Sequence, residues 1–268
     1  MSATPIPRSL TLVLYGKADV SVIDELPPGR QKIKSYVVPG RKYGDMLSFF
    51  EKHMRSGRQI YVVCPLIEEN EMFSSRAVKK VYAELKKHFS EFNVAMLHGQ
   101  MKNAEKDSIM SAFAQGEIQL IVTTTVIEVG MDVPNATIMC ILDAEHYGLA
   151  QLHQIRGRVG RGSEESFCFF VSDNKNAKER LDVLTKSSDG FEIAKKDMEM
   201  RGSGDLLGTR QHGESSFLVA DIIEDLPVFE KTKRLIEDLK MNNDPEYQNI
   251  ISMAKERFKN ESSEIVLN

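Results

Sequence analysis

A dense arginine cluster carries the clearest chemistry in the sequence. Arg156, Arg158 and Arg161 fall within six residues, in the run Gln154-Ile-Arg-Gly-Arg-Val-Gly-Arg161, and glycines separate them. Guanidinium groups bind phosphate through paired hydrogen bonds, and glycines let the backbone approach a ligand closely. A solvated basic turn is the alternative, but it does not require this spacing. We therefore expect a site that binds phosphate from several directions, with all three arginines exposed.

A run of threonines forms the second candidate. Thr123, Thr124 and Thr125 end an apolar stretch and lead into Val126-Ile-Glu-Val-Gly-Met-Asp-Val-Pro134. Hydroxyls beside a helix N-terminus offer hydrogen-bond donors to a nucleic-acid phosphate. Taken alone, such a run is more often a strand end with a helix cap, so both interpretations stay open.

The elements that must position these residues alternate between strand and helix. Apolar, β-rich runs occur at 10–15, 33–38, 60–64, 94–97, 120–123, 138–142 and 167–171, and helical periodicity occupies 41–55, 75–89 and 102–114. Gly57 and Gly116 follow two of these helices as expected C-terminal stops. Continuous apolar strands joined by helices predict a doubly wound, parallel α/β sheet over 33–171. Ligands of such sheets bind beyond the carboxyl ends of the strands, where His98-Gly99, the threonines and Asp143-Ala-Glu145 stand.

Composition limits the class of protein. The 268 residues carry a net charge of −4, so any nucleic-acid contact must be local. No apolar run reaches the roughly 18 residues of a membrane span, and the N-terminus lacks the apolar core of a secretory signal, which predicts a cytoplasmic protein. Cys64, Cys140 and Cys168 lie in separate apolar runs and are expected to be buried thiols.

The two motifs together resemble the second helicase superfamily, whose two RecA-like lobes bind ATP between them. The arginine run resembles the sixth motif of that superfamily, and 121–134 resembles its fifth. The resemblance implies that Arg158 and Arg161 supply the arginine-finger function and that Gln154 contacts the γ-phosphate region. The physical reason is that charge spreads over the γ-phosphoryl oxygens in the transition state.

The resemblance also assigns contacts beyond the arginine run. It implies that Gly130 and Asp132 contact the nucleotide, and that the nucleic-acid strand contacts a set comprising His98, Gly99, Thr123, Thr124 and Arg156. A lone histidine after a strand is equally often a structural hydrogen-bonding residue, so His98 keeps both interpretations. No metal ligands are expected in this chain.

The first 30 residues resemble the end of a first motor lobe. Met1-Ser-Ala-Thr-Pro-Ile-Pro-Arg8 resembles the third superfamily motif, yet no G-x-x-x-x-G-K-[ST] nucleotide cradle is present. Asp24-Glu25 mimics an acidic metal motif, but Pro27-Pro28 favours a linker. We therefore expect residues 1–30 to be a remnant of that lobe, which in a longer parent would bind ATP and Mg²⁺.

The region after residue 172 indicates one particular family within this superfamily. Helical periodicity at 176–186 and 191–200 predicts a hairpin, followed by the glycine-rich loop 201–213 and C-terminal helices. The segment 191–211 is similar to the translocation motif of the RecG family, ATP-dependent helicases that remodel stalled forks and Holliday junctions. That resemblance implies that four residues link ATP-driven lobe movement to a step along duplex DNA: Arg180, Arg201, Arg210 and Gln211. Arg201 could instead cap its helix and pair with Glu199 or Asp205.

The sequence thus predicts three parts: 1–30, a second RecA-like lobe at 31–172, and the hairpin, loop and C-terminal helices at 173–268. The expected function is that of the C-terminal motor lobe of a branched-DNA helicase, inactive without the first lobe. Its expected partners are branched or duplex DNA, the first lobe and an N-terminal DNA-binding region, with no membrane. A transcription–repair coupling translocase and a non-catalytic nucleic-acid-binding module are the alternatives.

Overall fold

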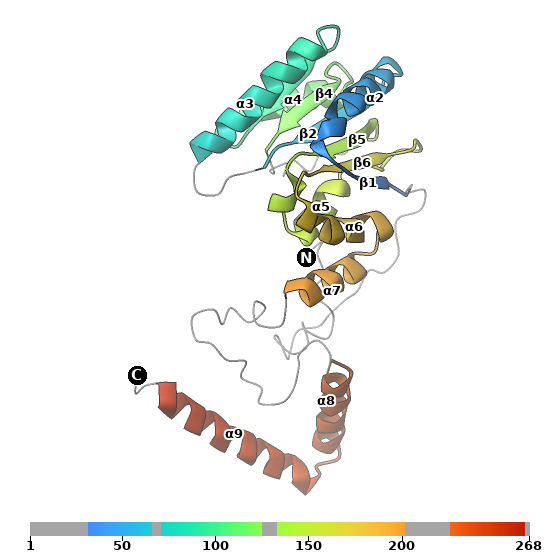
Figure 1. Ribbon diagram of the computed structural model, residues 1–268. Helices are drawn as coiled ribbons and strands as arrows, with labels where there is room; N and C mark the ends of the chain where they lie inside the picture. Colours follow the sequence, from blue (N-terminus) through green and yellow to red (C-terminus); the bar gives the residue numbers. More distant parts are fainter. Residues whose placement is uncertain (1–31, 66–70, 125–132, 202–225, 266–268) are drawn as a thin grey trace. The chain divides into compact units, whose positions relative to one another are not determined.

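The computed structural model describes residues 32–65, 71–124, 133–201 and 226–265. The chain divides into two compact units, and among the described residues the first unit runs to Arg201 and the second holds the C-terminal helices. The expected strand at 10–15 lies outside the described residues. Figure 1 labels the elements.

A single parallel sheet forms the centre of the first unit. Its six strands lie in the order β1-β6-β5-β2-β4-β3, and every neighbouring pair is parallel. The bounds are β1 Lys34–Val38, β2 Gln59–Val63, β3 Val94–Leu97, β4 Leu120–Thr123, β5 Ala136–Ile141 and β6 Phe167–Val171. Every residue of β2, β4 and β5 is buried, as the continuous apolar runs predicted for strands covered on both faces.

Helices cover both faces of the sheet, so the prediction of a doubly wound RecA-like lobe is confirmed (Figure 1). α2 (Tyr43–Arg55) and α3 (Glu71–His88) pack on one face, and α4 (Asn103–Ala114) and α5 (Leu149–Arg156) on the other. Gly57 and Gly116 both adopt φ of +81°, the left-handed conformation expected of a residue that ends a helix.

A helical hairpin continues from the sheet within the same unit. α6 (Lys178–Lys186) follows β6, and α7 (Gly190–Arg201) returns after a short turn. Leu181, Leu184 and Ile193 bury their side chains in the same apolar cluster as the α4 and α5 residues. The hairpin predicted after 172 is therefore confirmed, and it packs directly on one face of the lobe.

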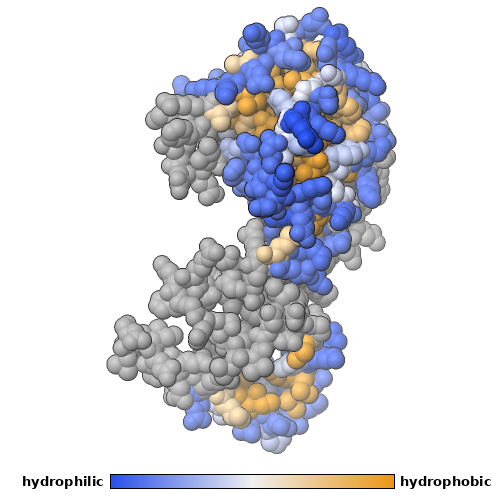
Figure 2. All heavy atoms as spheres, in the orientation of Figure 1, coloured by the Kyte–Doolittle hydropathy of each residue, from blue (hydrophilic) through white to orange (hydrophobic). Residues whose placement is uncertain are grey.

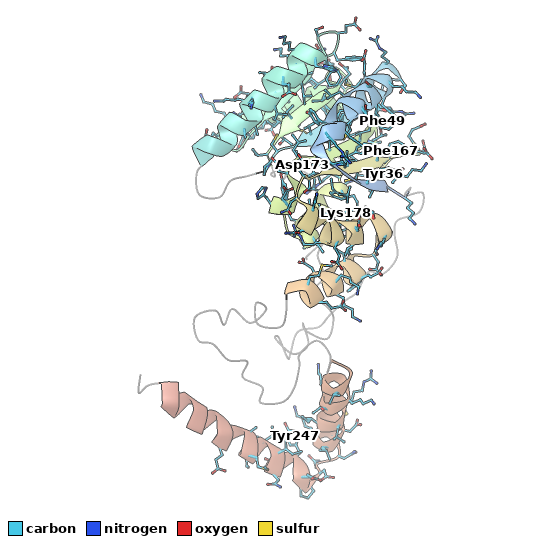
Figure 3. The ribbon with its side chains drawn as sticks, in the orientation of Figure 1. Tyr36, Phe49, Phe167, Asp173, Lys178 and Tyr247 are labelled. Carbon is cyan, nitrogen blue, oxygen red and sulfur yellow. The ribbon has the colours of Figure 1, made fainter. Side chains whose placement is uncertain are left out.

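Aromatic contacts at the edge of the sheet and buried cysteines within it are two further features of this unit. Phe49 of α2 meets Phe167 of β6 edge to face, with ring centroids 5.2 Å apart, and Tyr36 stacks on Phe169 nearby (Figure 3). The three cysteines are free and buried, as the sequence predicted, and burial raises the pKa of Cys64 and of Cys168 to about 12. They therefore stay protonated and inert at neutral pH.

The second unit contains α8 (Leu226–Met241) and α9 (Pro245–Ile265), which pack against each other. Pro227 and Pro245 lie in the first turns of these helices, where a missing N–H costs nothing, rather than interrupting them. Apolar side chains gather on this pair in Figure 2 and include the exposed Val228, Leu235, Met241 and Met253. Within the described ranges, no helix has both the length and the apolar character needed to cross a membrane.

Candidate functional site: the arginine loop and the carboxyl edge of the sheet

The arginine cluster occupies the end of α5 and the loop 157–166 that leads to β6, which we call the arginine loop. Its three arginines differ in environment. Arg156, on the last turn of α5, is only 3% exposed, and its Nη1 donates to the carbonyl oxygens of Leu184 (2.5 Å) and Ser187 (3.0 Å). The prediction that all three arginines are exposed is therefore wrong for Arg156. The Arg156 guanidinium therefore has structural partners at the hairpin, and its contact with a nucleic-acid strand stays a prediction.

The other two arginines are placed as an anion-binding loop would require. Arg161 is exposed, and its Nε lies 3.4 Å from the Gly157 carbonyl oxygen. Arg158 is half-buried, and its backbone N–H donates to the Ile155 carbonyl oxygen at 3.1 Å. Gln154 is exposed on α5, one turn before Arg158. The loop thus presents two cationic side chains and an amide from one short stretch of backbone.

The backbone of this loop is fixed from within. Val159 is fully buried in the core beneath it, and Gly160 adopts φ of +77°, a conformation that residues with a side chain rarely enter. The chain can therefore reverse direction between Arg158, which is half-buried, and Arg161, which is exposed. Preorganised cations of this kind stabilise charge that develops on a bound phosphoryl group.

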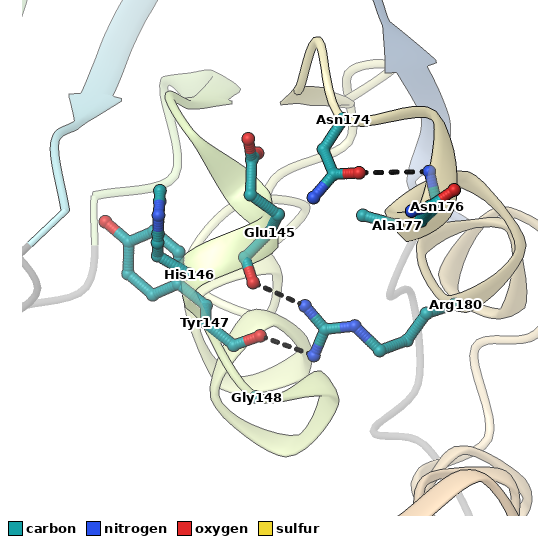
Figure 4. Close-up of a pocket in the computed structure, with 8 residues that line it drawn as sticks. All are labelled: Glu145, His146, Tyr147, Gly148, Asn174, Asn176, Ala177 and Arg180. Atoms are coloured by element: carbon teal, nitrogen blue, oxygen red, sulfur yellow. Dashed lines mark hydrogen bonds between the residues drawn. The ribbon is translucent and has the colours of Figure 1, made fainter.

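A second arginine attaches the hairpin to the same region. Arg180 of α6 donates to the carbonyl oxygens of Tyr147 (2.8 Å) and Glu145 (2.7 Å), which precede α5 (Figure 4). Together with Asn174 and His146 these residues line a pocket of about 410 Å³ between the end of β5 and the start of α6. Arg156 and Arg180 thus join the hairpin to both ends of α5.

The carboxyl edge of the sheet brings His98 and Gly99 to the surface beyond β3. Burial, followed by the charges of Lys79 and Lys106, lowers the pKa of His98, so that its imidazole is neutral at pH 7. Lys106 of α4 donates to the Gly99 carbonyl oxygen at 2.9 Å. These two lysines were not singled out from the sequence, because neither lies in a motif and only the fold brings them beside His98.

The threonines at the end of β4 are buried. Thr123 is 1% exposed and Thr124 is 2% exposed, and the Thr123 hydroxyl donates to the Thr124 carbonyl oxygen at 2.9 Å. Thr123 thus lies at a strand end, whereas the residues that it or its neighbours would cap, from 125 onward, lie outside the described part of the chain, so the helix-cap alternative stays open. A contact between these threonines and a nucleic-acid strand stays a prediction.

The neighbouring part of the same edge is acidic. Asp143 follows β5 in a left-handed conformation (φ +48°), and its pKa is raised by burial and by the charges of Glu145 and Asp173. Asp173 accepts a hydrogen bond from the Gly40 backbone N–H at 2.8 Å. Basic groups therefore flank the end of β3, whereas carboxylates flank the ends of β5 and β6.

Several predicted site residues lie outside the described part of the chain, namely Gly130, Asp132, Arg210 and Gln211. Arg201 ends α7, and its side chain is likewise not described. Glu199, one of its two suggested partners, is paired with Lys196 at 2.7 Å.

Comparison with known proteins assigns the arginine loop to a helicase. The helicase conserved C-terminal domain family matches residues 41–163, which include strands β2 to β5, α5 and the three clustered arginines. The family described as ATP-dependent DNA helicase RecG, domain 3, C-terminal matches residues 187–263, which follow directly on α6. The chain is related to the RecG helicases.

Individual RecG proteins match over almost the whole chain. RecG of Bacillus subtilis (strain 168) is 44% identical over 254 residues, which are 92% of this chain and 37% of that protein. RecG of Escherichia coli (strain K12) is 49% identical over 239 residues, which are 88% of this chain and 34% of that protein. The chain thus spans about a third of the length of the curated RecG relatives it matches.

A solved structure agrees with this assignment. The structure of RecG bound to a three-way DNA junction superposes with a TM-score of 0.67 at 44% identity, covering 86% of this chain and 30% of that one. A match over 86% of the chain is longer than the lobe at 31–172, so the likeness is not confined to that lobe.

The side chains of the arginine loop are chemically suited to an anionic ligand. The part of the chain that the structure describes holds no group of three or more His, Cys, Asp or Glu side chains placed to bind a metal. Arg158, Arg161 and Gln154, by contrast, are donor groups that fit phosphate oxygens. The chain's own contribution to an ATP site would therefore be cationic.

Proposed function

We propose that the chain is the second motor lobe of an ATP-dependent DNA helicase that remodels branched DNA, such as stalled forks and Holliday junctions, in recombination and repair. The observation that carries this proposal is the arginine loop of the RecA-like lobe, in which Arg161 is exposed and Arg158 half-buried on either side of the left-handed Gly160. The RecG relative bound to a three-way junction supports branched DNA as the substrate.

In this proposal ATP and Mg²⁺ are bound mainly by a first motor lobe. Bound ATP supplies the phosphoryl group whose hydrolysis drives the motor. Arg158 and Arg161 reach across the cleft and neutralise negative charge on the γ-phosphate, while Gln154 orients the same group and Gly130 and Asp132 contact the nucleotide. Each cation acts by position and charge, since phosphoryl transfer requires little covalent chemistry from the protein.

The hairpin gives the lobe a way to act on DNA. Arg156 and Arg180 attach it to both ends of α5, so movement of the arginine loop and movement of the hairpin are mechanically linked. Arg201, Arg210 and Gln211 then transmit that movement to duplex DNA, and His98, Gly99, Thr123 and Thr124 contact the strand along the carboxyl edge.

The proposal is tested with a full-length RecG-family protein that carries this chain. We expect ATP hydrolysis that depends on DNA, and unwinding of a three-way junction in preference to a linear duplex of the same length. Absence of DNA-stimulated hydrolysis would reject the motor function. Equal unwinding of the junction and the linear duplex would reject the specificity for branches.

Gly99 allows a separate test of the proposed DNA contact along the carboxyl edge of the sheet. Apart from its neighbours in the chain, a Cβ at Gly99 would meet none of the described atoms within 4 Å, so Gly99→Ala should leave the fold unchanged. If a phosphate approaches the Gly99 backbone closely, the added methyl group will weaken DNA binding about tenfold, or about 1.4 kcal/mol. Fluorescence anisotropy with a labelled junction measures the affinity.

The matched control is Gly44→Ala, because Gly44 lies in α2 and also has open space around it. We expect unchanged DNA affinity and a gain of about 0.5–1 kcal/mol in stability, since alanine favours the helix. Wild-type affinity in the Gly99→Ala protein would show that the backbone at Gly99 makes no close phosphate contact.

A further inference from the structure

Two backbone segments, 133–135 and 157–166, meet at the opposite edge of the sheet, where β5 and β6 begin. The segment Val133-Pro134-Asn135 leads into β5 and follows Gly130 and Asp132 in the sequence. The loop 157–166 carries Arg158 and Arg161 and leads into β6. Because β5 and β6 are parallel neighbours, both segments arrive at the same edge.

Gly162 brings the two segments into direct backbone contact. A Cβ at this position would lie 2.7 Å from the Pro134 carbonyl oxygen and 3.4 Å from its carbonyl carbon. Carbon atoms do not approach backbone oxygen this closely, so any side chain at residue 162 would push the segments apart. Glycine at this position therefore sets how close the arginine loop lies to Pro134.

Arg58 binds both segments with one side chain. Its Nη1 donates to Asn135 Oδ1 at 3.3 Å, and its Nη2 pairs with Glu164 Oε2 at 2.5 Å. The Asn135 side chain in turn donates to the Gly57 carbonyl oxygen at 2.5 Å. The Arg58 side chain is 26% exposed, so this ion pair is screened less than one that is fully in water.

These contacts lie outside the helicase motifs, and they involve residues 77 and 106 positions after Arg58. A guanidinium suits the role because its planar fork can bind an amide oxygen and a carboxylate simultaneously, which the ammonium of lysine does less well. Arg58 and Gly162 thus act on the same contact between segments 133–135 and 157–166, which we call the joint. Arg58 attracts both segments, and Gly162 permits their close approach.

We propose that Arg58 and Gly162 are positioning residues for ATP hydrolysis, which hold the arginine loop at a fixed distance from the segment that follows Gly130 and Asp132. The inference rests on the proposed function, because it assigns the joint a role in placing Arg158 and Arg161. Displacement of a catalytic group by about 1 Å can cost on the order of 100-fold in rate. Arg58 itself does not touch the nucleotide.

The kinetic test uses Arg58→Ala, Arg58→Lys and Gly162→Ala in a full-length RecG-family protein carrying this chain. For Arg58→Ala and Gly162→Ala we expect kcat for DNA-stimulated ATP hydrolysis to fall about 10- to 100-fold. KM for ATP and affinity for junction DNA should stay within about twofold, because the lost interaction acts mainly in the transition state. Arg58→Lys should recover part of kcat, since it retains a cation beside Glu164.

Arg55→Ala is the matched control. Arg55 is three residues away and pairs with Glu51 and Glu91, both at 2.7 Å, but its side chain is 57% exposed and does not contact either segment. We expect wild-type kinetics. If Arg58→Ala and Gly162→Ala also hydrolyse ATP at the wild-type rate, or if their junction affinity and thermal stability fall in step with kcat, the positioning role is overturned.

Hydrogen exchange measured on this chain tests the joint independently of ATP hydrolysis. Amides of 157–165 and 133–136 should exchange about tenfold faster in Arg58→Ala, while those of β2 and β4 remain as in the wild type. Unchanged exchange in the two segments would overturn the joint, whatever the ATPase result. A wild-type protein without ATPase would instead overturn the proposed function, and with it the catalytic consequence of the joint.

Discussion

Replacement of Arg161 with alanine is expected to lower DNA-stimulated ATP hydrolysis about 1,000-fold in a full-length RecG-family protein carrying this chain. Arg161 is exposed at the tip of a loop whose backbone is set by Gly160 and by the buried Val159. Its loss should therefore remove a cation from the nucleotide cleft without unfolding the lobe. Steady-state hydrolysis at saturating junction DNA measures the effect in kcat.

Two companion variants make this result interpretable. Arg161→Lys retains a positive charge but not the planar fork, so it should recover only part of the rate. Arg55→Ala removes an exposed arginine of the same lobe and should leave the rate unchanged. An Arg161→Ala protein with wild-type ATPase would remove Arg161 from the proposed arginine-finger role and leave Arg158 as the remaining candidate.

Much of the fold follows from patterns that act locally. Continuous apolar runs such as Leu120–Thr123 become fully buried strands, because a parallel sheet covered on both faces leaves no polar side for alternation. Gly57 and Gly116 end their helices as predicted, because few other residues enter the left-handed conformation that a helix stop requires. The motif residues of the arginine loop could likewise be found from spacing alone.

The environment of individual side chains could not be predicted in the same way. Arg156, Arg158 and Arg161 look alike in the sequence, yet α5 turns Arg156 inward against the hairpin while the following loop turns Arg161 outward. Which face of a short helix meets the hairpin depends on contacts with residues such as Leu184 and Ser187, about 30 positions away. Local spacing carries no information about such contacts.

Arg58 is a second residue whose environment could not be predicted from the sequence. Nothing in the turn that contains Arg58 distinguishes it from an ordinary solvated cation between a helix and a strand. Its partners Asn135 and Glu164 come together only because β2, β5 and β6 lie side by side in the order that the sheet adopts. The sequence predicted a parallel sheet but not this order of strands.

The buried guanidinium of Arg156 leads to the largest expected loss of stability. Arg156→Ala leaves the carbonyl oxygens of Leu184 and Ser187 without this donor and opens a space between α5 and the hairpin. Each buried acceptor that loses a charged donor costs on the order of 1–3 kcal/mol, so we expect the free energy of unfolding of this unit to fall by about 3 kcal/mol. Urea denaturation followed by circular dichroism measures the change.

Arg180→Ala is the matched comparison, because Arg180 also donates to two carbonyl oxygens at the base of the hairpin but is only partly buried. Arg180→Ala should lower the free energy of unfolding less than Arg156→Ala does, because water can replace the hydrogen bonds of Arg180. Faster hydrogen exchange in α6 and α7 should accompany the Arg156→Ala loss and locate it at the hairpin. If Arg156→Ala instead unfolds like the wild type while DNA affinity drops, then the Arg156 guanidinium must leave its carbonyl partners to bind DNA, and the contact predicted from the sequence would be supported.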